Sequence, residues 1–258
     1  MADNVFKINN LSFAYGKHTV INNLNLELAK GKITTLIGAN GCGKSTLFNL
    51  MTKNLVPESG EILLNGENIV NMKLKDFAKK VAIVHQYNTA PADITVKDLV
   101  AFGRTPYHTM GLSKDANEDE NMVQKAMKIT NIIKYKDKPV AELSGGQKQR
   151  VWIAMALAQD TKILFLDEPT TYLDIRYQLQ ILKLVRQLNE NYGITIIMVL
   201  HDINQSLYYS DEIIAMQSGK ILAHGSAESV ITADLIKQVY DVELEIKQVG
   251  GKPFVIPI

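Results

Sequence analysis

The sequence predicts an α/β fold in which a parallel core carries an antiparallel β subdomain and an inserted helical subdomain. An apolar, β-branched strand at residues 33–37 leads into a glycine-rich loop and then into a helix. Residues 4–29 alternate between apolar and polar, which is typical of strands with one solvated face. Residues 87–160 contain helical patterns and an alanine-rich apolar stretch, which indicate a helical lobe.

The chain has 258 residues, enough for one large domain with such a lobe. We therefore expect a single domain over residues 1–258. Its α/β core and antiparallel subdomain are assigned to residues 1–86 and 161–258, and its helical subdomain to residues 87–160.

Several helix boundaries can be predicted from local signals. Thr95 is a candidate N-cap for a short helix in the lobe. Residues 114–120 are charged and polar, so we expect a solvent-exposed loop ahead of a helix at 121–131. A long amphipathic helix is expected from Asp174 to residue 192, ended by Gly193. Its apolar residues stand at positions 175, 179, 182 and 185, the spacing of an amphipathic helix.

Composition excludes several classes of protein. The 28 Lys and Arg residues nearly balance 27 Asp and Glu residues, and a net charge of +1 favours no nucleic-acid partner. A single cysteine rules out a disulfide within the chain. The apolar run at residues 151–158 is too short to cross a bilayer, and residues 1–4 lack the features of a signal peptide. These features predict a soluble protein that reaches a membrane only through a partner.

The glycine-rich loop at residues 38–46 matches the phosphate-binding pattern G-x-x-x-x-G-K-[ST]. Its glycines allow backbone N–H groups to surround a polyphosphate, and the helix N-terminus favours the anion. Lys44 is expected to reach the β- and γ-phosphates, and the Ser45 hydroxyl to hold Mg²⁺. A chance glycine-rich turn is disfavoured because strand and helix stand where the pattern requires them. The predicted nucleotide-binding residues here are Gly38, Asn40, Gly41, Cys42, Gly43, Lys44, Ser45 and Thr46.

Polar residues stand at the carboxyl ends of three later predicted strands, on the side where α/β sheets bind ligands. Gln86 is a candidate contact to Mg²⁺ or to water, and Asp167 suits a Mg²⁺ contact through water. Glu168 is placed to polarise a water aimed at the γ-phosphate, and His201 to face that phosphate. Taken singly, each has an ordinary structural explanation. Their order after a phosphate loop favours the functional one.

The residues alone leave two interpretations open for each of two further stretches. Tyr15 is either a packed turn aromatic or a ring that stacks on adenine. In Leu143-Ser144-Gly145-Gly146-Gln147, Ser144 is expected to cap the following helix, and the two glycines allow a phosphate to approach its N-terminus. A helix cap alone would also explain this stretch.

Taken in order, these stretches resemble the ATP-binding cassette (ABC) ATPases over essentially the whole chain. Residues 38–46 resemble the Walker A loop, residues 163–167 resemble Walker B, and residues 143–147 match the family signature. The resemblance implies a P-loop NTPase core of RecA-like type with an antiparallel β subdomain and an inserted α-helical subdomain. It also implies an ATPase that uses ATP and Mg²⁺.

The resemblance further implies residue roles. It makes Tyr15 the adenine-stacking aromatic, Gln86 the Q-loop glutamine, Glu168 the general base and His201 the switch histidine. Residues 172–174 resemble the D-loop, with Asp174 as its acid. The signature residues Ser144, Gly145, Gly146 and Gln147 would complete the nucleotide site. Lys44, Gln86, Glu168 and His201 form the expected catalytic set, and Ser45, Gln86 and Asp167 the expected Mg²⁺ contacts.

Family membership implies partners as well. Two cassettes pair head to tail, so this chain is expected to pair with a second copy. It would dock on integral membrane permease subunits at the cytoplasmic face of the membrane. An extracytoplasmic substrate-binding protein would take part indirectly, and no nucleic acid would.

Four stretches resemble the branch that imports iron–siderophores, haem and cobalamin. They are residues 103–108, 152–161, 166–174 and 198–202. Together they favour ferric siderophores, with cobalamin or haem as the alternatives. His85 stands where many relatives have proline, a difference expected to affect docking rather than catalysis.

Three other kinds of cassette are the alternatives to an importer ATPase. A soluble cassette acting on ribosomes or DNA typically has two cassettes, coiled coils or basic extensions, which this sequence lacks. A regulatory cassette that binds ATP without hydrolysis is disfavoured because Glu168 and His201 are present. An exporter ATPase is disfavoured because exporters commonly fuse the cassette to membrane spans.

Overall fold

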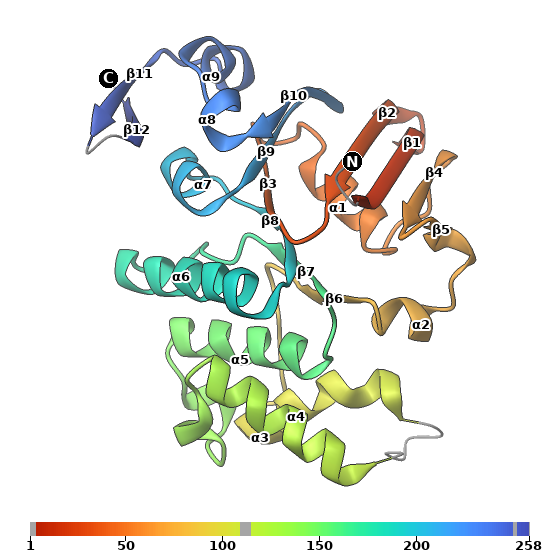
Figure 1. The fold of residues 1–258 in the computed structure, drawn as a ribbon, viewed down its shortest axis with the longest axis vertical. Helices are drawn as coiled ribbons and strands as arrows, with labels where there is room; N and C mark the ends of the chain where they lie inside the picture. Colours follow the sequence, from red (N-terminus) through yellow and green to blue (C-terminus); the bar gives the residue numbers. More distant parts are fainter. Residues whose placement is uncertain (1–3, 109–114, 250–251, 258) are drawn as a thin grey trace. The chain divides into compact units, whose positions relative to one another are not determined.

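The computed structural model describes residues 4–108, 115–249 and 252–257. They fold into two compact units (Figure 1), one formed by Met1–Met72 and Thr195–Ile258 and the other by Lys73–Ile194. None of the helices in these described ranges combines the length and the apolar character that a membrane crossing needs.

The first unit contains an antiparallel sheet with strand order β2-β1-β4-β5. Side chains along β1 alternate as predicted, with Phe6 and Ile8 buried and Lys7 exposed between them. One face of this sheet therefore lies on the core and the other meets solvent. The strands are β1 (Asn4–Tyr15), β2 (His18–Ala29), β4 (Ser59–Leu64) and β5 (Glu67–Asn68).

The same unit contains the strand that leads into the phosphate loop, β3, and the strands beside it. Strand β3 lies between β8 and β9 and runs parallel to both, and β10 pairs antiparallel with β9. All six residues of β3 are buried, as in parallel sheets covered on both faces. The bounds are β3 (Ile33–Gly38), β8 (Thr195–Val199), β9 (Glu212–Gln217) and β10 (Lys220–Ser226).

Helices and a terminal hairpin complete the first unit. Residues Ile236, Val239 and Val255, which lie in α9 and β12, join one hydrophobic cluster with Ile37 of β3 and Ile213 of β9. The C-terminal segment therefore packs on the strand that enters the phosphate loop. The elements are α1 (Lys44–Met51), η1 (Ile69–Asn71), α7 (Ile203–Tyr209), α8 (Ala227–Val230), α9 (Ala233–Tyr240), β11 (Leu244–Val249) and β12 (Lys252–Pro257).

In the second unit, β6 (Val81–Val84) pairs parallel with β7 (Ile163–Asp167). Helix α5 is buried along much of its length and contacts α3, α4 and α6. The other elements are α2 (Leu74–Ala78), α3 (Val96–Ala101), η2 (Phe102–Tyr107), α4 (Ala116–Ile129), η3 (Ile133–Tyr135), η4 (Val140–Glu142), α5 (Gly145–Ala158) and α6 (Ile175–Tyr192).

The predicted loop at 114–120 was wrong in its described part, because α4 begins at Ala116; residue 114 lies outside the described residues. The Asp115 side chain accepts hydrogen bonds of 3.0 Å from the N–H groups of Asn117 and Glu118. A side-chain cap satisfies N–H groups that the first turn leaves unpaired, so this charged stretch is helical.

The predicted ends of α6 and the Thr95 cap are confirmed. Asp174 caps α6 and Gly193 ends it with φ +63°, and the Thr95 hydroxyl accepts from the N–H of Asp98 at 3.1 Å. Of the apolar residues that indicated an amphipathic helix, Leu182 and Val185 are buried, whereas Ile175 is 76% exposed and Leu179 is 42% exposed. The buried residues are Ile181, Leu182, Leu184, Val185 and Leu188.

Candidate functional site

The phosphate loop joins β3 to α1 in the first unit, as the sequence predicted. Gly38, with φ +152°, ends β3 and has no room for a side chain. A Cβ there would lie 2.5 Å from the Met216 carbonyl oxygen and 2.6 Å from Cys42 Sγ. The loop therefore turns tightly against β9, and only glycine fits at its first position.

Lys44 folds back into this loop. Its Nζ donates to the carbonyl oxygens of Gly38 at 2.8 Å and Ala39 at 3.0 Å, and it lies 3.8 Å from Cys42 Sγ. The side chain is 5% exposed. The ammonium group is therefore held at the start of the loop, at the N-terminus of a helix that favours anions.

The other loop residues differ in exposure. Asn40, Gly41 and Ser45 are exposed, whereas Cys42, Gly43 and Thr46 are buried. An exposed hydroxyl in the first turn of α1 is available to a cation, and Mg²⁺ takes few protein ligands and keeps several waters or phosphate oxygens. The chemistry of Ser45 therefore fits a Mg²⁺ contact.

Tyr15 and His201 also belong to the first unit. Tyr15 ends β1, is 53% exposed and meets Phe13 edge-on, with ring centroids 4.9 Å apart. Its remaining surface is open to a stacking partner, while the contact with Phe13 also fits a turn aromatic. His201 is exposed just after β8, and Asp202 caps α7 by accepting from the N–H of Gln205 at 2.8 Å.

In the second unit, two predicted site residues come together at the ends of β6 and β7. Gln86 Nε2 donates to Glu168 Oε2 at 2.6 Å. The Thr171 hydroxyl donates to the same oxygen at 3.1 Å, and the Thr171 N–H donates to the Glu168 carbonyl at 3.2 Å. Asp167, the last residue of β7, is half-buried beside them in sequence. The carboxylate of Glu168 is thus oriented by an amide and a hydroxyl.

The signature residues begin α5. Gln147 Oε1 accepts from the N–H of Ser144 at 2.9 Å, and Gln147 Nε2 donates to the Tyr135 hydroxyl at 2.9 Å. Ser144 and Gly145 are exposed, so they are accessible to a ligand. Gly146 is buried, and a Cβ there would lie 2.3 Å from Cδ1 of Tyr177. The second glycine is therefore required by the packing of α5 on α6.

Asp174 is engaged locally, because its Oδ1 accepts from the N–H of Tyr177 at 3.1 Å. Tyr172, two residues before Asp174, and Tyr87, the residue after Gln86, are both exposed, and their hydroxyls are 2.9 Å apart. The hydrogen bond from Tyr172 raises the pKa of Tyr87 above its usual range.

Sequence reasoning missed Thr171 and Tyr240. Thr171 stands three residues after the predicted base, Glu168, and this spacing matches no known sequence pattern. Tyr240 accepts a hydrogen bond from Gly38, and no local signal connects residues so far apart in the chain.

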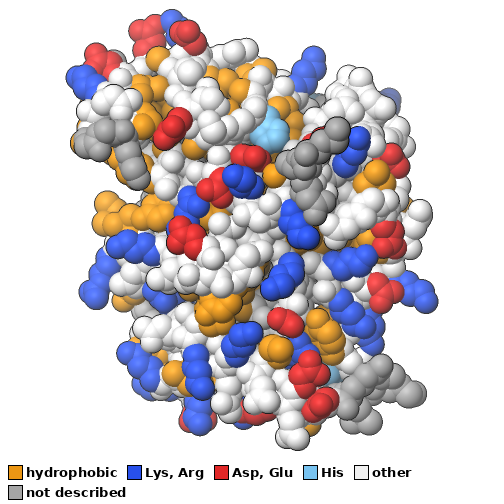
Figure 2. All heavy atoms as spheres, viewed as in Figure 1, with side chains coloured by type: hydrophobic (Ala, Val, Ile, Leu, Met, Phe, Trp, Pro, Cys, Tyr) orange, Lys and Arg blue, Asp and Glu red, His pale blue; other side chains and the backbone are white. Residues whose placement is uncertain are grey.

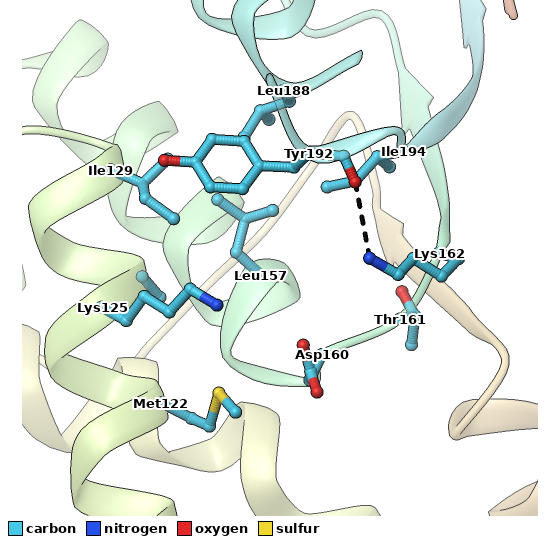
Figure 3. Close-up of a pocket in the computed structure, with 11 residues that line it drawn as sticks. Met122, Lys125, Ile129, Leu157, Asp160, Thr161, Lys162, Leu188, Tyr192 and Ile194 are labelled. Carbon is cyan, nitrogen blue, oxygen red and sulfur yellow. Dashed lines mark hydrogen bonds between the residues drawn. The ribbon is translucent and has the colours of Figure 1, made fainter. Parts of the chain in front are cut away.

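Figure 3 shows a separate, small pocket in the second unit, between the C-terminal ends of α4, α5 and α6. Leu157, Leu188 and Ile194 form an apolar part, and Lys125 and Asp160 lie at its edge. Its volume is about 60 Å³, whereas ligand pockets usually measure about 300–1,000 Å³. None of the predicted site residues lines it, so it is not a nucleotide site.

Comparisons with known proteins agree with this organisation. A family model described as ABC transporter matches residues 21–171. The chain is 46% identical to the iron(3+)-hydroxamate import ATP-binding protein FhuC of Bacillus subtilis (strain 168), over 92% of this chain and 87% of that one. It is 44% identical to the ferric enterobactin transport ATP-binding protein FepC of Escherichia coli (strain K12), over 96% and 92%.

A solved structure extends the likeness to the fold. The ATP-binding cassette MJ0796, dimeric and bound to ADP and phosphate, superimposes with a TM-score of 0.74 at 26% identity. The match covers 86% of this chain and 98% of that one. The predicted fold, with its P-loop core, is confirmed. The chain therefore belongs to the ABC transporter family, as one of its ATP-hydrolysing cassettes.

Proposed function

We propose that this chain is the energy-coupling ATPase subunit of an importer for iron chelates, with ferric siderophores as the cargo. The observation that carries the proposal is the 44–46% identity, over nearly the whole chain, to ATPases named for ferric hydroxamate and ferric enterobactin transport. Those two cargoes differ chemically, so the proposal specifies iron chelates as a class. Haem and cobalamin are the alternative cargoes.

Within this proposal, ATP is bound by the phosphate loop at residues 38–46, with Tyr15 against the adenine. Lys44, whose ammonium group has three N–H donors, would add a phosphate oxygen to its two loop carbonyl partners. Mg²⁺ would be held by Ser45, with Gln86 and Asp167 as further contacts, and would neutralise phosphate charge. In the same proposal, residues 87–160 form a helical subdomain and the other residues form the core with its antiparallel subdomain.

Hydrolysis is assigned to Glu168, whose carboxylate would take a proton from the attacking water. The hydrogen bonds from Gln86 and Thr171 support this role because they fix the direction of that carboxylate. His201 would contact the γ-phosphate. Asp174 and the signature residues Ser144, Gly145, Gly146 and Gln147 would complete the site in the partner cassette.

Two kinds of partner follow from the proposal. A second copy of the chain would supply the signature side of each nucleotide site, which is supported by the dimeric state of the similar cassette MJ0796. Permease subunits would dock on the second unit at the cytoplasmic face of the membrane. Leu74 of α2 and Phe102 of η2 are 70% and 56% exposed on elements that contact each other, and Tyr87 beside Gln86 is 70% exposed. A substrate-binding protein would act on the permease.

A cassette that acts on ribosomes or DNA is the alternative from another class. Figure 2 shows Lys and Arg side chains mixed with Asp and Glu side chains over the face drawn, rather than one basic field. A net charge of +1 agrees with this view. Nucleic-acid binding depends chiefly on clustered positive charge, so these observations favour the importer.

The test is to isolate the chain from its native membranes with its co-purifying proteins and to measure ATP turnover in proteoliposomes. We expect a polytopic partner, and turnover stimulated by a ferric siderophore together with its binding protein. Haem and cobalamin with their binding proteins serve as matched cargo controls. Stimulation by ribosomes or DNA alone, with no membrane partner, would contradict the proposal.

A further inference from the structure

Tyr240 joins the C-terminal segment to the phosphate loop within the first unit. It is the last residue of α9, and its hydroxyl accepts a hydrogen bond of 3.1 Å from the N–H of Gly38. Burial raises the pKa of Tyr240 to about 12, so the phenol is neutral at physiological pH. The acceptor is therefore a neutral hydroxyl placed at the first residue of the loop.

The peptide groups of Gly38 are held on both sides. Its N–H is bound by Tyr240, and its carbonyl oxygen accepts from Lys44 Nζ at 2.8 Å. Gly38 has no side chain of its own to fix it, and the nearby Met216 carbonyl limits it on one side. The first contact is on the Ile37–Gly38 peptide and the second on the neighbouring Gly38–Ala39 peptide, so Tyr240 stands one peptide away from the carbonyl oxygen that holds the Lys44 ammonium group.

The segment that carries Tyr240 is itself anchored. Ile236 and Val239 of α9 pack in the same cluster as Ile37, the residue before Gly38. The hairpin that follows is tied to α7, because Asn204 Nδ2 donates to the Val255 carbonyl at 2.9 Å and the Val255 N–H donates back at 2.8 Å. Figure 1 shows α9 and this hairpin at the end of the chain, drawn in blue. The packing of α9 and the hydrogen bonds of the hairpin therefore hold the Tyr240 hydroxyl in place.

We propose that Tyr240 is a positioning residue for ATP binding: its hydroxyl fixes the N–H of Gly38 and thereby the carbonyl of the same residue, which directs the Lys44 ammonium group. The proposal rests on the proposed role of Lys44 in binding phosphate. The C-terminal segment would therefore contribute to the affinity for ATP, although it lies outside the phosphate loop.

The test is the variant Tyr240→Phe, which keeps the ring and removes only the hydroxyl. This variant loses one hydrogen bond and leaves the buried N–H of Gly38 unpaired. The dissociation constant for ATP should therefore rise about three- to tenfold. Calorimetric titration of the full chain with ATP measures this change, and thermal unfolding measures stability. Tyr209→Phe is the matched control, the same chemical change on α7 of the same unit, and should bind ATP as the parent chain does.

The outcomes separate the hypotheses. A weaker ATP affinity in Tyr240→Phe alone supports positioning, whereas a lower melting temperature with unchanged affinity overturns it, because the ring would then only pack. Lys44→Ala is run beside it: if that variant binds ATP normally, the proposed phosphate loop fails. If Lys44→Ala loses ATP and Tyr240→Phe does not, only the Tyr240 proposal fails.

A second measurement does not depend on the folding of a variant. In the parent chain, the Gly38 amide proton should exchange slowly with solvent, because Gly38 is buried and its N–H is bound to the hydroxyl of the half-buried Tyr240. Slow exchange supports the contact on which the proposal stands. Exchange as fast as that of an exposed loop amide would overturn it.

Discussion

The carboxylate of Glu168 accepts two hydrogen bonds on the same oxygen, from Gln86 and from Thr171. Its backbone is in the left-handed region, with φ +48°, which is uncommon for a residue other than glycine. Such a conformation costs free energy and is typical of sites where a side chain must point in one direction. The side chain and backbone of Glu168 are thus both constrained, which supports its proposed role as general base.

Glu168→Gln tests the base directly. An amide cannot accept the proton of the attacking water, so kcat for ATP hydrolysis should fall by about 10²–10⁴-fold. The dissociation constant for ATP should change less than about twofold, because the phosphate contacts are intact. Phosphate release and calorimetric titration measure the two effects, with Glu142→Gln, an exposed acid in η4, as control. Unimpaired hydrolysis in Glu168→Gln would remove the base assignment.

Thr171→Val tests whether the hydroxyl orients that base. Valine keeps the shape of threonine but cannot donate to Glu168 Oε2, so kcat should fall about fivefold while KM for ATP stays the same. Thr170→Val is the matched control at the neighbouring position. A KM effect in Thr171→Val, or equal losses of kcat in both variants, would count against an orienting role.

At the scale of secondary-structure elements, the packing of α5 on α6 depends on a glycine in the signature. A methyl group at Gly146 would overlap the ring of Tyr177, whereas one at Gly145 would meet Leu173 Cδ2 at an ordinary 3.5 Å. Overpacked sites lose stability because the surrounding backbone and side chains must shift. The two adjacent glycines therefore serve different purposes.

The pair Gly146→Ala and Gly145→Ala separates these purposes. Gly146→Ala should lower the free energy of unfolding by about 1–3 kcal/mol, measured by urea denaturation. Gly145→Ala should leave it within about 0.5 kcal/mol, because its methyl group has room. Equal stability of the two variants would show that α5 and α6 can separate without cost.

At the scale of the whole molecule, the residues proposed to bind ATP are divided between the two units. Lys44, Tyr15 and His201 belong to one unit, and Glu168 and Ser144 to the other. In a symmetric head-to-tail pair, each nucleotide would meet Lys44 from one copy and Ser144 from its partner. Such a pair can be tested by combining damaged copies.

Lys44→Ala and Ser144→Arg should each abolish hydrolysis, the first by loss of phosphate contacts and the second by a bulky cation at the signature. Mixed in equal amounts, half of the dimers would contain one intact composite site, so activity should return to about a quarter of the parent value. Steady-state ATP hydrolysis measures this recovery. No recovery in mixtures that do form heterodimers would contradict head-to-tail pairing.

The sequence by itself determined what depends on near neighbours in the chain. The glycine loop between β3 and α1, the Thr95 and Asp174 caps and the end of α6 at Gly193 all follow from residues a few positions apart. Capping and turn preferences act over three or four residues, and motif order is a property of the chain alone. The family and its fold were therefore predictable.

The tertiary structure alone decided which side chains meet across long stretches of sequence. The pairing of Gln86 with Glu168, the contact of Tyr240 with Gly38 and the overlap that Gly146 avoids join residues separated by 31 to 202 positions. Apolar spacing alone does not give the buried face of α6, because burial depends on what packs against a helix. Ile175 and Leu179 have the periodic spacing but are exposed. Such contacts depend on packing and strand order, which no local pattern encodes.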